Sequence, residues 1–362
     1  MSGDSMAGQC NPIFDSLALE LGDFSCRGAP AVVHLRNPFG LSNWTLPVVE
    51  LLLVTVALAA LAHSVRRLRR DGDPTALALW SATVIYLFVV EIPLYFPNIF
   101  GVEDTLGVVF AHNVFSVQFL FDRLPLYIVA LYPAVVTLSY EIVRSLGVFR
   151  DRGILLGAVC AGFVHHCFYE VFDQLGPQLR WWSWNTDNAL NHPMLAAVPM
   201  TSVFIFATLG PIVVTALVVL LVRPGSHRGA LAWRIVAAGA LTPLGLAVLS
   251  IPTSLFGGET PDTGAQAVLF TIELALVAVV AVGTLVRQWS RIRSGAAEAA
   301  GPVTFLRVFG PTYLGVFAIL WAAALPAYFA ASQGVTADGT PIGSLGYAAA
   351  CFLGAAGCLA GA

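Results

Sequence analysis

The sequence has very little charge and no lysine. Only 11% of its 362 residues are charged, all 18 basic residues are arginines, and the formal net charge is −3. Soluble domains carry about 25% charged residues, and so small a net charge gives no reason to expect a nucleic-acid partner. With 57% hydrophobic residues and a mean hydropathy of +0.80, the chain has more apolar surface than a soluble fold can bury. The lipid bilayer must therefore be its solvent.

Familiar motifs of soluble enzymes are also missing. The chain has no P-loop, dinucleotide fingerprint, G-x-S-x-G elbow or haem-attachment motif, so no cofactor is predicted. None of the six cysteines forms a C-x-x-C pair, and four lie on apolar segments, where small buried residues are expected. Cys10 and Cys26 share the N-terminal tail, where a disulfide and two free thiols both stay open.

What the chain does contain is a series of long hydrophobic runs. A membrane-spanning helix needs about 20 mostly apolar residues. Eight runs meet this requirement and a ninth ends at the last residue: about 46–65, 76–98, 124–143, 153–175, 195–222, 231–256, 265–286, 303–331 and 344–362. The predicted fold class is an all-α, polytopic transmembrane helix bundle of eight or nine spans, covering residues 45–362. Residues 1–44 form a tail too short for an independent core.

The arginines indicate an orientation, because they follow every second span. They lie at Arg66, Arg67, Arg69 and Arg70; Arg144, Arg150 and Arg152; Arg223, Arg228 and Arg234; and Arg287, Arg291 and Arg293. The alternate connections are acidic instead, with Glu103, Asp104, Asp122, Asp187, Glu259, Asp262 and Asp338. Basic loops stay cytoplasmic, so we predict a multi-pass protein of the cell membrane with its N-terminal tail exported. A span at Thr105–Phe121 would reverse this pattern, and that segment is predicted to be interfacial or re-entrant.

Ionisable side chains at membrane depth are the main functional signal. Such groups are costly in a bilayer and usually serve a site or a buried network. His166, Glu170 and Asp173 fall at i, i+4 and i+7 on one helix stripe, and Glu91 lies at a similar predicted depth. These four residues are the candidate catalytic groups, with a carboxyl as general acid.

The same stripe has a second interpretation as part of a metal site, because imidazole and carboxylate can share an ion. The chain has no H-E-x-x-H sequence, and other ligands would have to come from distant helices. The pattern therefore favours a hydrogen-bonded histidine–carboxylate network, and no metal is predicted.

Aromatic and polar neighbours complete the candidate site. Tryptophans follow Arg180 closely, and they indicate either an interfacial aromatic belt or the wall of a cavity for a flat or polyene-like ligand. The candidate substrate-binding residues are Trp181, Trp182, Trp184, Asn185, Tyr169, His165 and Glu273.

The part of the chain that contains Asp173 and the tryptophans is similar to a known family. Asp173, then Pro177, then Trp182-x-Trp184 and a returning helix resemble the integral-membrane carotenoid-biosynthesis family that includes carotenoid hydratases. The stretch Glu103-x-x-x-Gly107 looks like the first acidic module of that family. The likeness covers less than a third of the chain, and the proline–asparagine helix entry of the family is replaced here by Pro199-Met-Thr-Ser. The resemblance implies acid–base chemistry on an isoprenoid double bond, with Asp173 and Glu103 as the matching acids.

Three functions stay open on the sequence. The first is a membrane-embedded enzyme acting by acid–base chemistry on a lipid-soluble, isoprenoid-like or carotenoid-like substrate. The second is a transporter or proton-coupled permease with Glu91, Glu170 and Glu273 as its relay. The third is a non-catalytic membrane scaffold. If the protein is an enzyme, we expect a cavity that is closed toward the arginine-rich side. If it is a transporter, we expect polar groups that continue through the bundle to the arginine-rich side.

Overall fold

The structure is a computed structural model that describes residues 11–22, 24, 28–222, 228–258, 260–299 and 303–362. Eight helices in this part of the chain are long and apolar enough to cross a membrane: α3 (Thr45–Asp71), α4 (Thr75–Tyr95), α6 (Leu126–Ser145), α8 (Ile154–Asp173), the continuous η3–α9 (Ser202–Leu221), α10 (Arg228–Leu249), α12 (Thr263–Arg293) and α13 (Thr304–Ala330). The predicted polytopic helical bundle is confirmed. The ninth helix, α14 (Leu345–Gly361), has only 17 residues. Cys10, Cys26, Arg223 and Glu259 lie outside the described residues.

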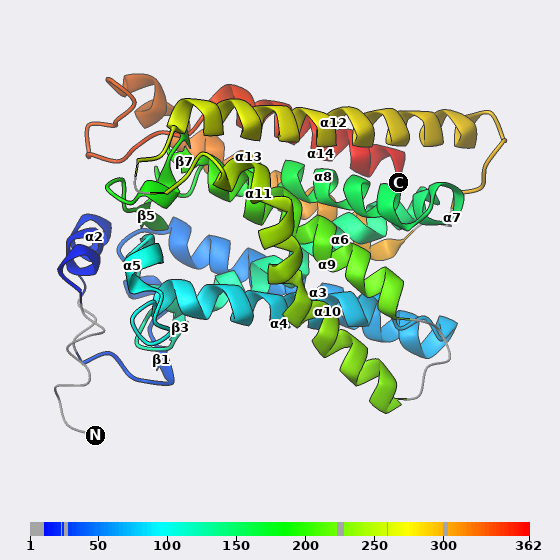
Figure 1. The fold of residues 1–362 in the computed structure, drawn as a ribbon, viewed down its shortest axis with the longest axis horizontal. Coiled ribbons are helices and arrows are strands. Elements are labelled where there is room, and N and C mark those ends of the chain that lie inside the picture. The colour runs from blue at the N-terminus through cyan, green and yellow to red at the C-terminus, as the bar shows by residue number, and fades with distance from the viewer. Residues whose placement is uncertain (1–10, 23, 25–27, 223–227, 259, 300–302) are drawn as a thin grey trace.

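The long helices alternate in direction, so their connections gather at two ends of the bundle (Figure 1). We call one of them the strand end. It holds all the short strands together with α2 (Pro12–Gly22), α5 (Glu103–Leu106) and α11 (Ile251–Ser254). The other is the arginine end, where α3, α6, α9 and α12 end and where the short helix α7 (Val148–Arg152) lies. Which end faces the cytoplasm stays a prediction from the arginines.

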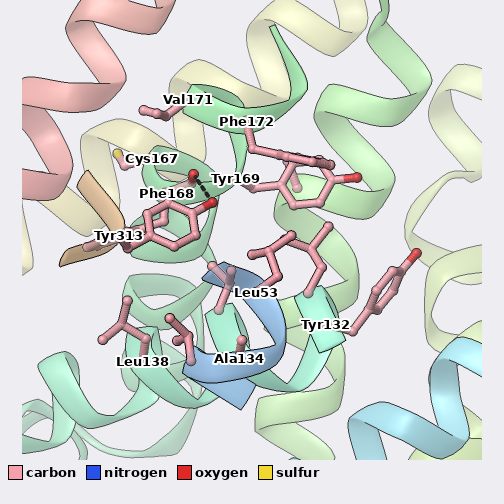
Figure 2. Close-up of a cluster of buried hydrophobic side chains, with 14 of the residues drawn as sticks. Leu53, Tyr132, Ala134, Leu138, Cys167, Phe168, Tyr169, Val171, Phe172 and Tyr313 are labelled. Carbon is pink, nitrogen blue, oxygen red and sulfur yellow. Dashed lines mark hydrogen bonds between the residues drawn. The ribbon is translucent and has the colours of Figure 1, made fainter. Parts of the chain in front are cut away.

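Helices α6 and α8 form the centre of the bundle. Over an apolar stretch of 18 residues in each helix, 89% of the residues are buried in α6 and 72% in α8. The corresponding share in α12, at the periphery, is 17%. Figure 2 shows side chains of α3, α6, α8 and α13 meeting around this centre, where the Tyr313 hydroxyl donates to the Phe168 carbonyl at 3.0 Å. At Gly162 a side chain would collide with Ile212. The small residue therefore lets α8 approach α9 closely, as Ala158-x-x-x-Gly162 predicts.

The segment Thr105–Phe121 is not a spanning helix. It contributes α5, β2 (Phe110–His112) and β3 (Val117–Phe119) to the strand end. Strand β3 lies between β1 (Val33–Leu35) and β4 (Leu124–Pro125), while β2 pairs with β5 (Trp182–Trp184). All pairs are antiparallel, and they join the N-terminal tail to the loops of the bundle.

Two predicted span boundaries are wrong because of prolines. The fifth span was expected to start at Leu195, but 194–199 form the hairpin β6 (Met194–Leu195) and β7 (Val198–Pro199), and helix begins near Ser202. Pro199 has no N–H to donate and restricts the residue before it. The sixth span was expected to reach Phe256, but α10 ends at Leu249, and the separate turn α11 follows with Pro252 in its first turn.

Candidate functional site

The strand pair β2–β5 forms a roof over one part of the bundle. Its register places Phe110 opposite Trp184 and His112 opposite Trp182. Side chains alternate between the two faces of a strand, so these four rings share one face. The opposite face carries Ala111, which packs among α2 side chains, and Ser183, whose hydroxyl donates to Glu20 at 3.1 Å. The N-terminal tail thus covers the outer face of the roof and leaves the aromatic face turned to the bundle.

Below this roof lies a small, mostly apolar cavity with a few polar groups in its wall, which we call the acid cavity. Two carboxyls from different helices line it, Glu91 of α4 and Asp173 of α8. Its remaining polar lining comes from Tyr132, Tyr169 and Ser202, together with the roof rings. The cavity volume is about 30 Å³. Since a water molecule needs roughly 10–15 Å³ measured in this way, the cavity has room for about two.

The two carboxyls of the acid cavity have only uncharged hydrogen-bond donors. Both are almost fully buried, with exposures of 5% for Glu91 and 1% for Asp173. The Tyr132 hydroxyl donates to Oε1 of Glu91 at 2.6 Å, and the Ser202 hydroxyl donates to Oδ2 of Asp173 at 2.9 Å. Oε2 of Glu91 has no hydrogen-bond partner of ordinary geometry within the described residues, and the Tyr95 hydroxyl lies near the same carboxyl. A buried oxygen left open in this way is free to bond a ligand in the cavity.

His112 connects the roof to the helices beneath it. Its Nε2 lies 3.1 Å from the Tyr95 hydroxyl and its Nδ1 lies 3.0 Å from the Tyr127 hydroxyl. Burial lowers the pKa of His112 to about 3, so the ring is neutral near pH 7. A neutral imidazole has one donor and one acceptor. One tyrosine must therefore donate to the ring and the other must accept from it, so the hydrogen bonds through the ring all point the same way.

The roof also presents unused donors. The indole nitrogens of Trp182 and Trp184 are buried and have no partner among the described residues. Trp182 packs on Phe172 with ring centroids 4.9 Å apart. At Gly176 an added Cβ would overlap the Trp182 ring, so the glycine lets the indole lie directly on the backbone after α8.

The helix that closes the cavity is irregular. Residues Ser202–Leu209 form the π-helical segment η3, in which the Thr208 hydroxyl donates to the Val203 carbonyl, five residues earlier, at 3.0 Å. Short π-helical segments often occur at functional sites. Here the wider turn places Ser202 and Phe206 in the acid cavity and Thr208 in a different hollow.

That second hollow contains His166 and lies among α8, α12 and α14. It is a cleft of about 470 Å³, mostly apolar. Because the Thr208 hydroxyl donates to Val203, it accepts from Nδ1–H of His166 at 2.9 Å. Nε2 of His166 forms a hydrogen bond of 2.8 Å with the Tyr347 hydroxyl. His166 therefore belongs to a threonine–histidine–tyrosine chain and does not line the acid cavity.

The structure divides the predicted site residues into two groups. Glu91, Asp173, Tyr169, Trp182 and Trp184 line the acid cavity. The others lie outside it: Glu170, His165, His166, Trp181, Asn185 and Glu273.

Each residue in the second group has its own surroundings. Glu170 is fully buried and accepts from the Gln174 amide at 3.0 Å. His165 donates from Nδ1 to the Ala207 carbonyl at 2.8 Å and stacks on Tyr169. Glu273 is half-buried on α12.

Trp181 and Asn185, also in the second group, hold the loop after α8 in place. The Trp181 indole is buried and donates to the Thr45 hydroxyl at 2.9 Å. The Asn185 amide donates to the Val108 carbonyl at 2.8 Å and so braces the start of β2. Glu103, which the family resemblance matched to an acid, is exposed on α5.

Sequence reasoning did not assign His112, Tyr132 or Ser202 to the site. The alternation Phe110-Ala-His112 against Trp182-Ser-Trp184 is the signal that pairs the two strands, but nothing local gives their register. Within the described residues, no group of three or more histidine, cysteine, aspartate or glutamate side chains is placed to hold a metal ion.

Comparisons with protein-family models, with curated proteins and with solved structures each returned no match to this chain.

Proposed function

We propose that this multi-pass membrane protein is an enzyme that carries out acid–base chemistry on a double bond of a lipid-soluble, isoprenoid-like substrate. The observation that supports it is the acid cavity. Two buried carboxyls, Glu91 and Asp173, come from separate helices and line one water-sized hollow below an aromatic roof. A positioned acid and base of this kind is what proton transfer to and from a substrate requires.

In the proposed reaction Glu91 is the acid. Its Oε1 is held by Tyr132, and its Oε2 has no partner in the described residues, so a proton on Oε2 is available to one carbon of the double bond. The electron pair of the double bond forms the new C–H bond, which leaves positive charge on the other carbon. Water in the cavity adds to that carbon, and its proton passes to Asp173. Loss of a neighbouring proton to Asp173 without water addition would give an isomer.

The aromatic roof suits the cationic intermediate of such a reaction. Indole faces attract positive charge, by about 2 kcal/mol or more when water is excluded. Trp182 and Trp184 line the cavity together with Phe110 and Phe172. The neutral His112 adds no competing charge. An extended substrate needs more space than about 30 Å³, so its entry requires displacement of the half-buried Trp184 and Phe206 at the edge of the cavity.

The permease alternative has less support. Its predicted relay groups do not share a cavity, since Glu170 and Glu273 lie outside the one that Glu91 lines. At the arginine end Glu141 is held by Arg67 at 2.5 Å and by Arg144 at 2.8 Å. A carboxylate held by two guanidinium groups is a poor proton carrier.

The test compares the membrane lipids and pigments of cells that express the wild-type chain, Glu91→Gln or Asp173→Asn. Wild-type cells should accumulate a hydrophobic product that differs from its precursor by one water, or that is its isomer, and both variants should lose it. Glu273→Gln is the matched control, because it makes the same chemical change outside the acid cavity. Identical profiles in all four strains, or equal loss in Glu273→Gln, would contradict the proposal.

A further inference from the structure

A third pocket opens at the arginine end, between α3 and the start of α13. Its volume is about 580 Å³. Four arginines line it, Arg66, Arg67, Arg70 and Arg144, together with one carboxylate, Asp71, and its remaining wall is partly apolar. We call it the arginine pocket. It lies at the opposite end of the bundle from the acid cavity and contains none of the residues of the proposed reaction.

Two of the arginines are held in position by acidic side chains. Glu141 is fully buried and binds Arg67 at 2.5 Å and Arg144 at 2.8 Å, and Arg67 also pairs with Asp73. His63 approaches the same carboxylate at 3.4 Å and stacks on Phe305 with ring centroids 5.1 Å apart. The base of the pocket is thus a fixed array of donors.

The other two arginines are uncommitted. Arg66 and Arg70 are exposed and lie one helical turn apart on α3, so they share a face. Neither has an ion pair within the part of the chain that the structure describes. They are free to bind an anion that enters the pocket.

The start of α13 adds backbone donors to this array. The helix begins at Thr304 after Val303, whose side chain cannot accept a hydrogen bond, and both residues line the pocket. The first N–H groups of a helix have no partner within it, and the helix dipole favours negative charge there. Phe305 and Phe309 of the same helix supply an apolar wall.

We propose that the arginine pocket binds a phosphoryl group carried on an apolar molecule, as in the headgroup of an anionic phospholipid. Arg66 and Arg70 bind the phosphoryl oxygens, since guanidinium groups match the geometry of phosphate. The apolar wall contacts the glycerol and the first chain carbons. An anion without an apolar part would make no use of the apolar wall that contains Phe309.

The test titrates the full-length protein in a neutral detergent with short-chain phosphatidylglycerol, short-chain phosphatidylcholine or inorganic phosphate, following the thermal unfolding midpoint. Wild type should show saturable stabilisation by phosphatidylglycerol. The double variant Arg66→Gln/Arg70→Gln should weaken that binding about tenfold or more, because each charged contact is strong. Arg69→Gln is the matched control, since Arg69 lies between these residues on α3 but outside the pocket. Elution volume and helical circular dichroism check that each variant is folded.

The lipid and phosphate arms separate the two sources of the phosphoryl group. Tighter binding of phosphatidylglycerol than of phosphate, reduced by Phe309→Ala, supports a lipid headgroup. Equal binding of both, with Phe309→Ala unchanged, would overturn the apolar part of the proposal. No saturable stabilisation by either, or equal weakening by Arg69→Gln, would overturn it entirely.

Discussion

Buried carboxyls occur at both ends of this bundle, but their neighbours differ. At the arginine end, Glu141 is enclosed by Arg67, Arg144 and His63. At the strand end, Glu91 accepts from a tyrosine hydroxyl and has one oxygen without a partner in the described residues. The arginines therefore neutralise the charge of Glu141, whereas Glu91 keeps an oxygen that can still accept a hydrogen bond. Burial of an acid is therefore not by itself a sign of chemistry, and the neighbours decide its role.

The same contrast holds for the shape of the two ends. The strand end is covered by α2 and the paired strands, and its cavity is water-sized. The arginine end has a pocket about twenty times larger. A water-sized site lined by aromatic rings suits proton transfer with little bulk water present, and a large cationic pocket suits a ligand that enters from the membrane surface.

The strongest test of this comparison is removal of each carboxylate in turn. Glu141→Gln leaves the partly buried Arg144 without this counter-charge and leaves Arg67 with Asp73 alone, and breaking a buried pair in this way costs about 3–5 kcal/mol. Glu91→Gln keeps an oxygen that accepts from Tyr132, and so should cost about 1 kcal/mol or less. Denaturant unfolding in a fixed detergent measures both free energies. Equal losses would mean that the two carboxyls have the same structural role.

A second test uses pH. The pKa of His112 is lowered to about 3 in the folded protein, against about 6.5 unfolded. Below pH 6.5 the unfolded chain binds a proton that the folded chain does not, so the free energy of unfolding falls as pH falls toward 3. Between pH 6 and pH 4.5 this one group should cost about 2 kcal/mol.

The control for the pH test is His112→Gln, which removes the titrating group. Its free energy of unfolding should be lower than that of wild type at pH 7, because bonds to Tyr95 or Tyr127 are weakened, but its decline toward pH 4.5 should be shallower. Parallel declines for the two proteins would show that His112 is not a buried neutral ring.

The helical bundle was predictable because a spanning helix is a local property. About 20 apolar residues suffice to identify it, and the eight predicted spans correspond to eight helices. The failures at Leu195 and Phe256 are also local, since hydropathy counts a proline inside an apolar run without regard to its missing N–H. Pro199 lies just before the start of one of these helices, and Pro252 lies just after the end of the other.

The acid cavity was only partly predictable because it depends on contacts distant in sequence. The stripe of His166, Glu170 and Asp173 is correct as helix geometry, but α8 has different neighbours along its length. Near His166 they are α12, α14 and the end of η3, and near Asp173 they are the start of η3 and the roof. His112 and Trp182 are 70 positions apart, and only the pairing of β2 with β5 brings them together. One sequence does not contain the register of such a pair.

The smallest expected effect on stability comes from comparing a tyrosine hydroxyl that makes a hydrogen bond with a neighbouring one that makes none. Tyr132 and Tyr86 are both buried, with ring centroids 5.7 Å apart. The Tyr132 hydroxyl donates to Glu91, whereas the Tyr86 hydroxyl has no partner among the described residues. Tyr132→Phe should lower the free energy of unfolding by about 0.5–1.5 kcal/mol. Tyr86→Phe removes a buried group that makes no bond, so it should leave stability unchanged or raise it.

The two tyrosine variants also differ in what they do to the proposed reaction. Tyr132→Phe frees both oxygens of Glu91 and should reduce product formation, while Tyr86→Phe should keep it. Unfolding in detergent and product yield in membranes measure the two effects separately. A Tyr86→Phe variant as damaged as Tyr132→Phe in both measurements would show that Glu91 depends on a wider network than the single hydroxyl that holds its Oε1, and the assignment of Oε2 as the reactive oxygen would fail with it.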